Sequence, residues 1–209
     1  MERINVSARW FTHRGVLTLL ALFAALTLSA QTAQQVLDKT AAVVSAKQGT
    51  QLSFTIKGEH MKTSGTIAIK GRKFHATIPQ ATIWFDGKTQ WTYLKKSEEV
   101  NIATPSESEL AAINPYNFIN IYKQGYQYSM VKKGTNFIVH LTAKDQKRGI
   151  QEMYITVNQK TYIPSQIRMK QQKSWTTIDV SNFKAVSLAD GIFRFNAKDF
   201  PQAEVIDLR

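Results

Sequence analysis

The sequence predicts a mainly β protein with a few helices, an α+β chain whose strands form an incomplete antiparallel β-barrel. Residues 65–94 alternate apolar and polar side chains with a period of two, as strands with one buried face do. An Asp86-Gly87 pair, which favours a tight hairpin turn, lies within this stretch. About eleven short strands follow one another through polar turns, without the alternation of strands and helices that indicates a parallel sheet.

The first thirty residues have the composition of an export signal. Three arginines precede an apolar run over residues 16–28, and Ser29-Ala30 provide the small residues of a cleavage site. This run is shorter than the roughly 18 residues that cross a bilayer, so an uncleaved anchor is the weaker alternative. We expect residues 1–30 to be a signal peptide cleaved near Ala30. Residues 31–209 would then form a single periplasmic domain.

The composition limits what the exported chain can be. It has no cysteine, which excludes disulfides and an acylated N-terminal cysteine. The formal net charge of +12 falls to +10 without residues 1–30, which carry three arginines and one glutamate. The lysines are scattered over strand ends and turns, as on solvated sheet edges, and attraction to anionic lipid or an acidic partner is the alternative. The expected compartment disfavours nucleic acid as a partner.

Periodicity locates the elements in order. Residues 31–47 carry apolar side chains near helical spacing and are followed by Gly49, which predicts one amphipathic helix. Between the sixth and seventh strands, early Pro and Glu residues and the Asn114-Pro115 pair predict two short helices, 106–113 and 115–122. The predicted strands are 52–56, 63–70, 73–78, 81–85, 91–93, 97–103, 126–131, 137–141, 153–157, 162–169 and 174–183.

A curved antiparallel sheet has a concave face that its own side chains, a helix or a ligand must fill. We expect a hydrophobic, lipid-binding cavity lined by the strand aromatics Phe54, Phe74, Trp91, Tyr93 and Phe137. The two short helices would cover this cavity as a movable lid that presents Leu110, Ile113, Phe118, Ile119 and Tyr122. The alternative is that the aromatics are ordinary core and the helices simply fill the concavity.

Four motifs together resemble the periplasmic outer-membrane lipoprotein carrier family, LolA. They are Gly65 with Lys70 and Phe74, the hairpin Asp86-Gly87-Lys88-Thr89 with Trp91 and Tyr93, the Asn114-Pro115 pair, and the tail with Phe193, Phe195 and Phe200-Pro201. The resemblance extends over nearly the whole exported chain. It implies an incomplete barrel of about eleven strands and a helical lid over a cavity for lipoprotein acyl chains.

The resemblance also implies partners. A carrier of this family acts as a monomeric chaperone that receives acylated outer-membrane lipoproteins from an inner-membrane ABC exporter and delivers them to an outer-membrane receptor or the outer membrane. Receptors of the same fold are lipoproteins, so the absence of cysteine argues against that role. In the family an arginine before a proline, between the second and third strands, helps to hold the lid closed. Here the segment is Lys70-Gly71-Arg72-Lys73 without proline, and Arg72 is the candidate, with Lys70 as the alternative.

Other function classes have less support in the sequence. His60, His75 and His140 have no neighbours at catalytic or metal-ligand spacing, so we expect neither an enzyme nor a metal or cofactor site. A periplasmic lipid or glycolipid sensor, or a carrier of another amphiphile, is the second hypothesis, because similar stress regulators reuse this half-barrel. Such regulators usually carry a second domain, which we do not expect here because the chain stops soon after Val205.

Overall fold

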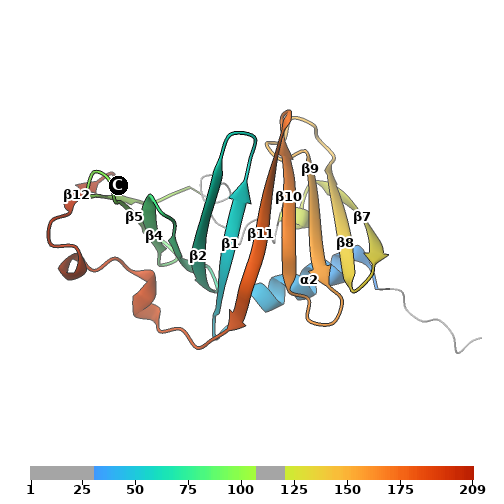
Figure 1. The fold of residues 1–209 in the computed structure, drawn as a ribbon, viewed down its shortest axis with the longest axis horizontal. Coiled ribbons are helices and arrows are strands. Elements are labelled where there is room, and N and C mark those ends of the chain that lie inside the picture. The colour runs from blue at the N-terminus through green and yellow to red at the C-terminus, as the bar shows by residue number, and fades with distance from the viewer. Residues whose placement is uncertain (1–30, 107–120) are drawn as a thin grey trace, which may run out of the picture. The chain divides into compact units, whose positions relative to one another are not determined.

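Twelve strands form one continuous sheet in the described residues, 31–106 and 121–209 of the computed structural model (Figure 1). The strands are β1 (Thr50–Lys57), β2 (Lys62–Lys70), β3 (Lys73–Thr77), β4 (Ala81–Phe85), β5 (Gln90–Leu94), β6 (Glu99–Ala103), β7 (Tyr126–Lys133), β8 (Asn136–Ala143), β9 (Glu152–Asn158), β10 (Pro164–Gln171), β11 (Ser174–Ala185) and β12 (Glu204–Asp207). The eleven predicted strands are all present, and β12 is an addition that the sequence analysis missed.

The order of the strands is that of two meanders joined edge to edge. Strands β1 to β6 pair in sequence, β7 to β11 pair in sequence, and β1 pairs with β11 to join the two runs. Every pairing is antiparallel except that of β12 with β6, which is parallel. Short polar turns connect most neighbours; at Asp86-Gly87 the Asp86 carboxylate accepts hydrogen bonds from the Lys88 and Thr89 amides and Gly87 has a φ of 102°.

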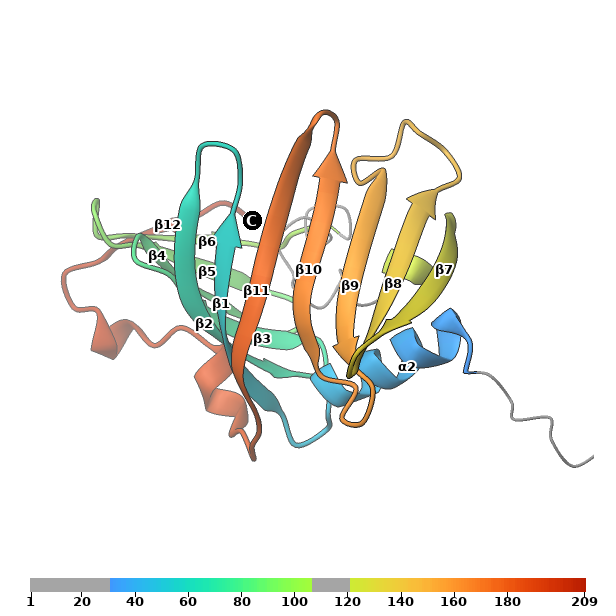
Figure 2. The same cartoon turned by 45° about the vertical axis from the view of Figure 1, so that its right-hand side comes forward.

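The sheet curls and remains open, as predicted for an incomplete antiparallel barrel. Figure 2 shows β4 to β6 turned steeply away from β1 and β11, so that one face of the sheet becomes concave. Strand β7 forms one edge, and β12 forms the other. Because the strands do not close on themselves, the concave face must be covered by something other than a second half of the barrel.

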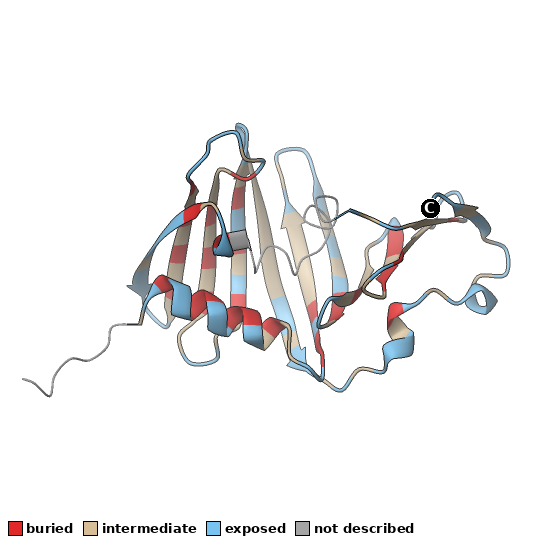
Figure 3. Ribbon diagram, turned by 180° about the vertical axis from the view of Figure 1, so that it is seen from behind, coloured by how far each residue is buried: buried red, intermediate tan, exposed pale blue. Residues whose placement is uncertain are grey.

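Helix α2 (Ala33–Val44) covers part of the concave face, over β7 and β8 (Figure 3). The helix begins with a capping box, in which the Thr32 hydroxyl accepts from the Gln35 amide and the Gln35 side chain accepts from the Thr32 amide. Its buried stripe includes Val36, Leu37 and Val44. The amphipathic helix predicted over 31–47 is confirmed, and the apolar stripe is what attaches it to the sheet.

Two clusters of buried side chains make up the core. One lies beneath the first half of α2 and combines Val36 and Leu37 with inward-facing residues of β8 to β10, such as Val139, Leu141 and Met153. The other combines the end of α2 with β1 to β4, where the Phe74 and Phe85 rings lie 5.5 Å apart. Residues of both clusters, such as Ile167 from the first and Ile67 from the second, line one apolar cavity.

Three 3-10 helices complete the described chain: η1 (Ile121–Lys123), η2 (Asp190–Phe193) and η3 (Ala197–Asp199). The two short helices predicted over 106–122 fall almost entirely outside the described residues. Residues 186–209, here called the C-terminal segment, contain η2, η3 and β12. Among the described residues no helix has the length and apolar character needed to cross a membrane.

Candidate functional site

An apolar cavity of about 450 Å³ lies on the concave face, next to helix α2. Its lining comes from the end of α2 and from β1 to β4, β10 and β11, with Met61 from the β1–β2 turn. The lining has no charged side chain among the described residues, and most of it is aliphatic: Val44, Leu52, Ile56, Ile67, Ile69, Ala76, Ile78, Ile83, Ile167, Ile178 and Val180. The volume is within the roughly 300–1,000 Å³ of small-molecule sites, and the lining suits a hydrocarbon chain.

Strand register explains why these residues face the same cavity. Residues directly opposite one another in a ladder share a face. Ile178 is opposite both Ile167 and Ile56, and Ile67 is opposite both Leu52 and Ala76. Each pairing continues the aliphatic face into the next strand, so the period-two pattern of six strands produces one continuous apolar surface.

Gly65 makes room for the side chain of Phe54, one of the residues that line the cavity. Gly65 is opposite Phe54, and a Cβ on Gly65 would lie 2.8 Å from Phe54 Cζ. The same Cβ would also overlap the carbonyl oxygen of Thr77. Glycine at this position therefore allows the Phe54 ring to lie across β2.

The structure places two of the five aromatic residues expected in the cavity within its lining. Phe54 and Phe74 are both lining residues; Phe54 is half-buried and Phe74 is fully buried. Phe137 packs instead in the cluster beneath helix α2, opposite Val157. The aliphatic residues of β10 and β11 were missed, although Ile167, Met169, Ile178 and Val180 show the period-two alternation that could have identified them.

Trp91 and Tyr93 lie on the opposite face of the sheet from the cavity. Tyr93 is opposite Thr82 and Trp91 is opposite Trp84, whereas the cavity-lining Ile83 points to the other face. The C-terminal segment packs on this face against Tyr93 and Trp84. Phe200 lies 4.6 Å from the Tyr93 ring and 5.5 Å from the Trp84 ring, and Phe195 lies 5.6 Å from Trp84, all between ring centroids.

The lid residues are mostly outside the described part of the chain. Leu110, Ile113, Phe118 and Ile119 all belong to residues 107–120, which the structure does not describe. Tyr122, the fifth, is buried in the cluster with α2, and its hydroxyl donates a hydrogen bond to Asp38 of that helix. Whether residues 106–122 act as a lid stays a prediction.

The two candidates for holding the lid closed lie at the β2–β3 turn. Arg72 is exposed at this turn and has contacts of its own. Lys70 contacts the C-terminal segment: its Nζ donates to the Leu188 carbonyl at 2.8 Å and lies 2.9 Å from Asp190 Oδ1. Lys73 reaches the other Asp190 oxygen at 3.0 Å. Hydrogen bonds from Lys70 and Lys73 lower the pKa of Asp190 below its usual value of 3.8.

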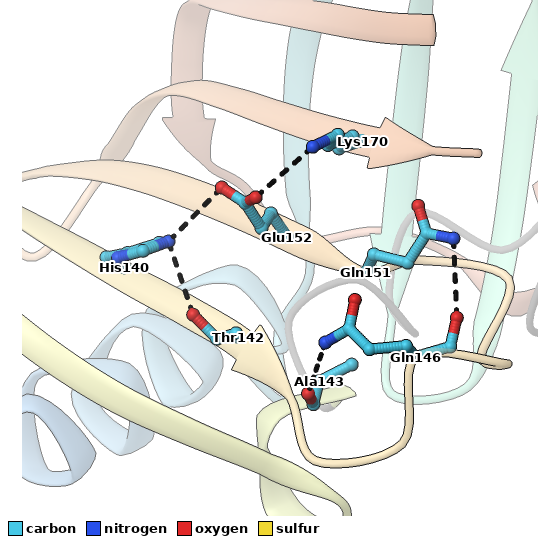
Figure 4. Close-up of polar contacts among 7 residues, drawn as sticks. All are labelled: His140, Thr142, Ala143, Gln146, Gln151, Glu152 and Lys170. Atoms are coloured by element: carbon cyan, nitrogen blue, oxygen red, sulfur yellow. Dashed lines mark hydrogen bonds and ion pairs between the residues drawn. The ribbon is translucent and has the colours of Figure 1, made fainter. Parts of the chain in front are cut away.

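His75 and His140 lie away from the cavity, whereas His60 is exposed in the β1–β2 turn beside Met61. His140 is on the outer face, stacked on Tyr154 at 4.2 Å, with Nε2 3.6 Å from Glu152 Oε2 and 3.4 Å from the Thr142 hydroxyl (Figure 4). Lys170 Nζ reaches the other Glu152 oxygen at 3.4 Å. His75 stacks on Trp84, and burial lowers its pKa. Within the part of the chain that the structure describes, no three His, Asp or Glu side chains converge as a metal site would require.

Comparisons with known proteins agree with this architecture. A model of the family described as "Outer membrane lipoprotein carrier protein LolA" matches residues 22–173. Among curated proteins, none matches the sequence. An uncharacterized conserved protein from Thermus thermophilus has the same fold, with a TM-score of 0.58 at 15% identity over 85% of this chain and 99% of that chain.

Two further solved structures align with lower TM-scores. A LolA superfamily protein from Nitrosomonas europaea aligns with a TM-score of 0.45 at 16% identity, covering 79% of this chain and 99% of that one. A putative outer membrane lipoprotein-sorting protein domain from Vibrio parahaemolyticus aligns with a TM-score of 0.45 at 10% identity, covering 78% and 96%. The family model matches well over half of the sequence, and the chain therefore belongs to the outer membrane lipoprotein carrier protein LolA family.

Proposed function

We propose that this protein is a periplasmic chaperone that binds the acyl chains of lipoproteins in the concave cavity and carries them from the inner to the outer membrane. The observation that carries the proposal is the uncharged, mainly aliphatic lining of the 450 Å³ cavity. In this proposal residues 1–30 direct export and are removed near Ala30. The donor is an inner-membrane ABC exporter, and the acceptor is an outer-membrane receptor or the outer membrane itself.

Energetics explain why such a carrier needs a cavity of this kind. Each methylene buried in a membrane contributes about 0.8 kcal/mol, so two or three acyl chains are held by tens of kcal/mol. A water-soluble protein can remove them only by offering an apolar surface of comparable extent. Its affinity must also lie between those of donor and acceptor, and a cover that competes with the ligand for the cavity would reduce the affinity to that range. Residues 106–122 are the proposed cover.

The proposed role requires binding and no bond chemistry. The polar cluster around His140 is on the outer face, and among the described residues the side chains that line the cavity offer no nucleophile beyond two threonine hydroxyls, those of Thr63 and Thr176. A carrier without catalytic residues, metal or cofactor fits this lining. The second hypothesis, a sensor or carrier of another amphiphile, shares the cavity and differs in cargo.

The test is release of a triacylated lipoprotein from spheroplasts or inner-membrane vesicles by purified residues 31–209. We expect a soluble one-to-one complex. Ala76→Phe should abolish it, because Ala76 lines the cavity and a phenylalanine ring would occupy the ligand volume. Thr66→Phe is the matched control, since Thr66 is exposed on the neighbouring strand β2 and faces the other side of the sheet.

Two outcomes would argue against the proposal, and a third would attribute the lost release to misfolding of the variants. Binding of free lipid without release of lipoprotein would favour the second hypothesis. Equal release by wild type and Ala76→Phe would exclude the cavity as the binding site. Equal loss of lipoprotein release in Ala76→Phe and Thr66→Phe would mean that both substitutions disturb the fold. Near-ultraviolet circular dichroism would detect such a change in tertiary packing.

A further inference from the structure

The cavity has one polar end. Among its described lining residues, the three with hydrogen-bonding side chains are Thr63, Gln171 and Thr176, and all lie close to the β1–β2 and β10–β11 turns. The opposite end, toward Leu52, Ile69 and Phe74, is entirely apolar. The Thr63 hydroxyl is buried and has no hydrogen-bond partner among the described residues. This distribution matches an amphiphile that lies with its polar group toward the two turns.

Two hairpin tips form this end of the sheet, and they are joined to each other. The tips are residues 58–61 between β1 and β2 and residues 171–174 between β10 and β11, and we call them together the hairpin end. The views in Figures 1 and 2 place both tips at the same end of the sheet. The Ser174 hydroxyl donates to the Glu59 carboxylate at 2.9 Å, which connects the tips across β1 and β11.

Met61 connects the cavity with the outside. Its side chain lines the cavity and lies against Gly58, yet Met61 is 53% exposed. A large apolar side chain exposed at the entrance of an apolar cavity is unfavourable in water and favourable at a bilayer interface. Apolar lining residues therefore extend from Met61 at the tip of the hairpin to Phe74, beside the three polar side chains.

Two exposed lysines lie at this end of the sheet: Lys62 follows Met61 in the chain, and Lys173 is in the other tip. Lys62 and Lys173 are exposed and have no ion-pair partner within the described residues, whereas Lys57 is paired with Asp179 at 2.7 Å. Glu59 is the one carboxylate in the two tips, and it is bound by Ser174. An exposed apolar residue flanked by lysines is the arrangement expected at a surface that meets anionic headgroups, where the lysines extend to phosphate while the apolar side chain enters the acyl region.

We propose that the hairpin end docks on an anionic phospholipid bilayer, and that acyl chains pass between bilayer and cavity along Met61. The inference rests on the proposed function, because it assumes that the cavity holds acyl chains. The chains enter toward Phe74 while the polar group stays at Thr63, Gln171 and Thr176. Docking removes the need for an acyl chain to cross water, which would otherwise cost about 0.8 kcal/mol for each methylene.

The test measures sedimentation of residues 31–209 with vesicles of phosphatidylcholine, with and without phosphatidylglycerol. The hairpin-end variant is Lys62→Gln/Lys173→Gln, which leaves every side chain of the cavity lining unchanged. The matched control is Lys132→Gln/Lys133→Gln, because these two lysines are exposed neighbours on edge strand β7 and are not part of the cavity. Binding of a fluorescent fatty acid without vesicles tests the cavity separately.

We expect the wild type and the control to bind phosphatidylglycerol vesicles, and the hairpin-end variant to bind them at least about 25-fold more weakly. The hairpin-end variant should also take up a pyrene-labelled lipid from those vesicles more slowly, while still binding the soluble fatty acid. Equal binding to pure phosphatidylcholine vesicles, no binding to either vesicle, or equal loss in both variants would overturn docking at the hairpin end. Failure of the wild type to bind the fatty acid would instead overturn the proposed function.

Discussion

Gly65 and Phe54 are directly opposite each other in the β1–β2 ladder, and the Phe54 ring lies where a Gly65 side chain would be. The pair gives the cavity an aromatic residue on a strand that otherwise contributes aliphatic side chains. It also brings the Thr77 carbonyl on β3 close to Gly65. The shape of the lining thus depends on the absence of a side chain as much as on those present.

Gly65→Ala should destabilise the sheet by about 1–3 kcal/mol, because the new methyl group overlaps both the Phe54 ring and the backbone of Thr77. Urea denaturation followed by tryptophan fluorescence measures this difference. Adding Phe54→Ala should restore only part of the loss, since the Thr77 carbonyl remains. Gly149→Ala is the control and should change the stability by less than about 0.5 kcal/mol, as nothing lies within 4 Å of its Cβ position.

Ile56→Asp should reduce the affinity for a fluorescent fatty acid at least about tenfold, because a carboxylate in the apolar lining must be desolvated when a ligand binds. Thr55→Asp changes the adjacent residue, which faces the other side of β1, and should leave the affinity unchanged. Titration of both variants makes the comparison. Similar affinities for the two would show that fatty acid binds elsewhere on the protein.

Tyr93 and Phe200 should be energetically coupled by about 0.5–1.5 kcal/mol, since their ring centroids are 4.6 Å apart. A double-mutant cycle with Tyr93→Leu and Phe200→Leu, read from urea denaturation, measures the coupling. A parallel cycle with Trp175 and Phe200 serves as the reference, because Trp175 packs with Tyr154 on another part of the sheet. Additive effects at Tyr93 and Phe200 would mean that the C-terminal segment is not held by this contact.

Attachment of the C-terminal segment should weaken in acid through Asp190. Hydrogen bonds from Lys70 and Lys73 lower its pKa in the folded state, so the stabilisation is present above the usual value of 3.8 and is lost as the pH falls through the lowered pKa. Asp190→Asn should reduce the stability at neutral pH and flatten its decline below about pH 4. Denaturation at a series of pH values tests this, and an unchanged acid profile would contradict it.

The sequence was sufficient for strands β1 to β11, for helix α2 and for the pairing of consecutive strands within each meander, but not for the pairing of β1 with β11. Alternation within β1 to β11 and polar turns such as Asp86-Gly87 are local signals, and consecutive strands joined by short turns pair with each other. Strand β12 gave no such signal, because it is four residues long and pairs in parallel with β6, whose residues lie about one hundred positions earlier. A pairing of that separation depends on the route of the C-terminal segment, which no local pattern records.

The candidate site was less predictable than the fold. Phe54 and Phe74 were expected in the cavity and line it, whereas Trp91 and Tyr93 belong to strands with the same alternation and lie on the opposite face. The aliphatic residues that dominate the lining were passed over in favour of aromatics. Residue type alone does not distinguish a ligand cavity from a core, because both bury apolar surface.

By itself, the sequence determined the strands, the amphipathic helix, the basic charge and which residues of each strand share a face. Only the tertiary structure decided which of the two faces is concave and what covers the other one. The physical reason is that alternation has a period of two and is symmetric between the faces of a sheet. Curvature and the packing of Phe195 and Phe200 against Trp84 remove that symmetry, and both arise from contacts between residues far apart in the chain.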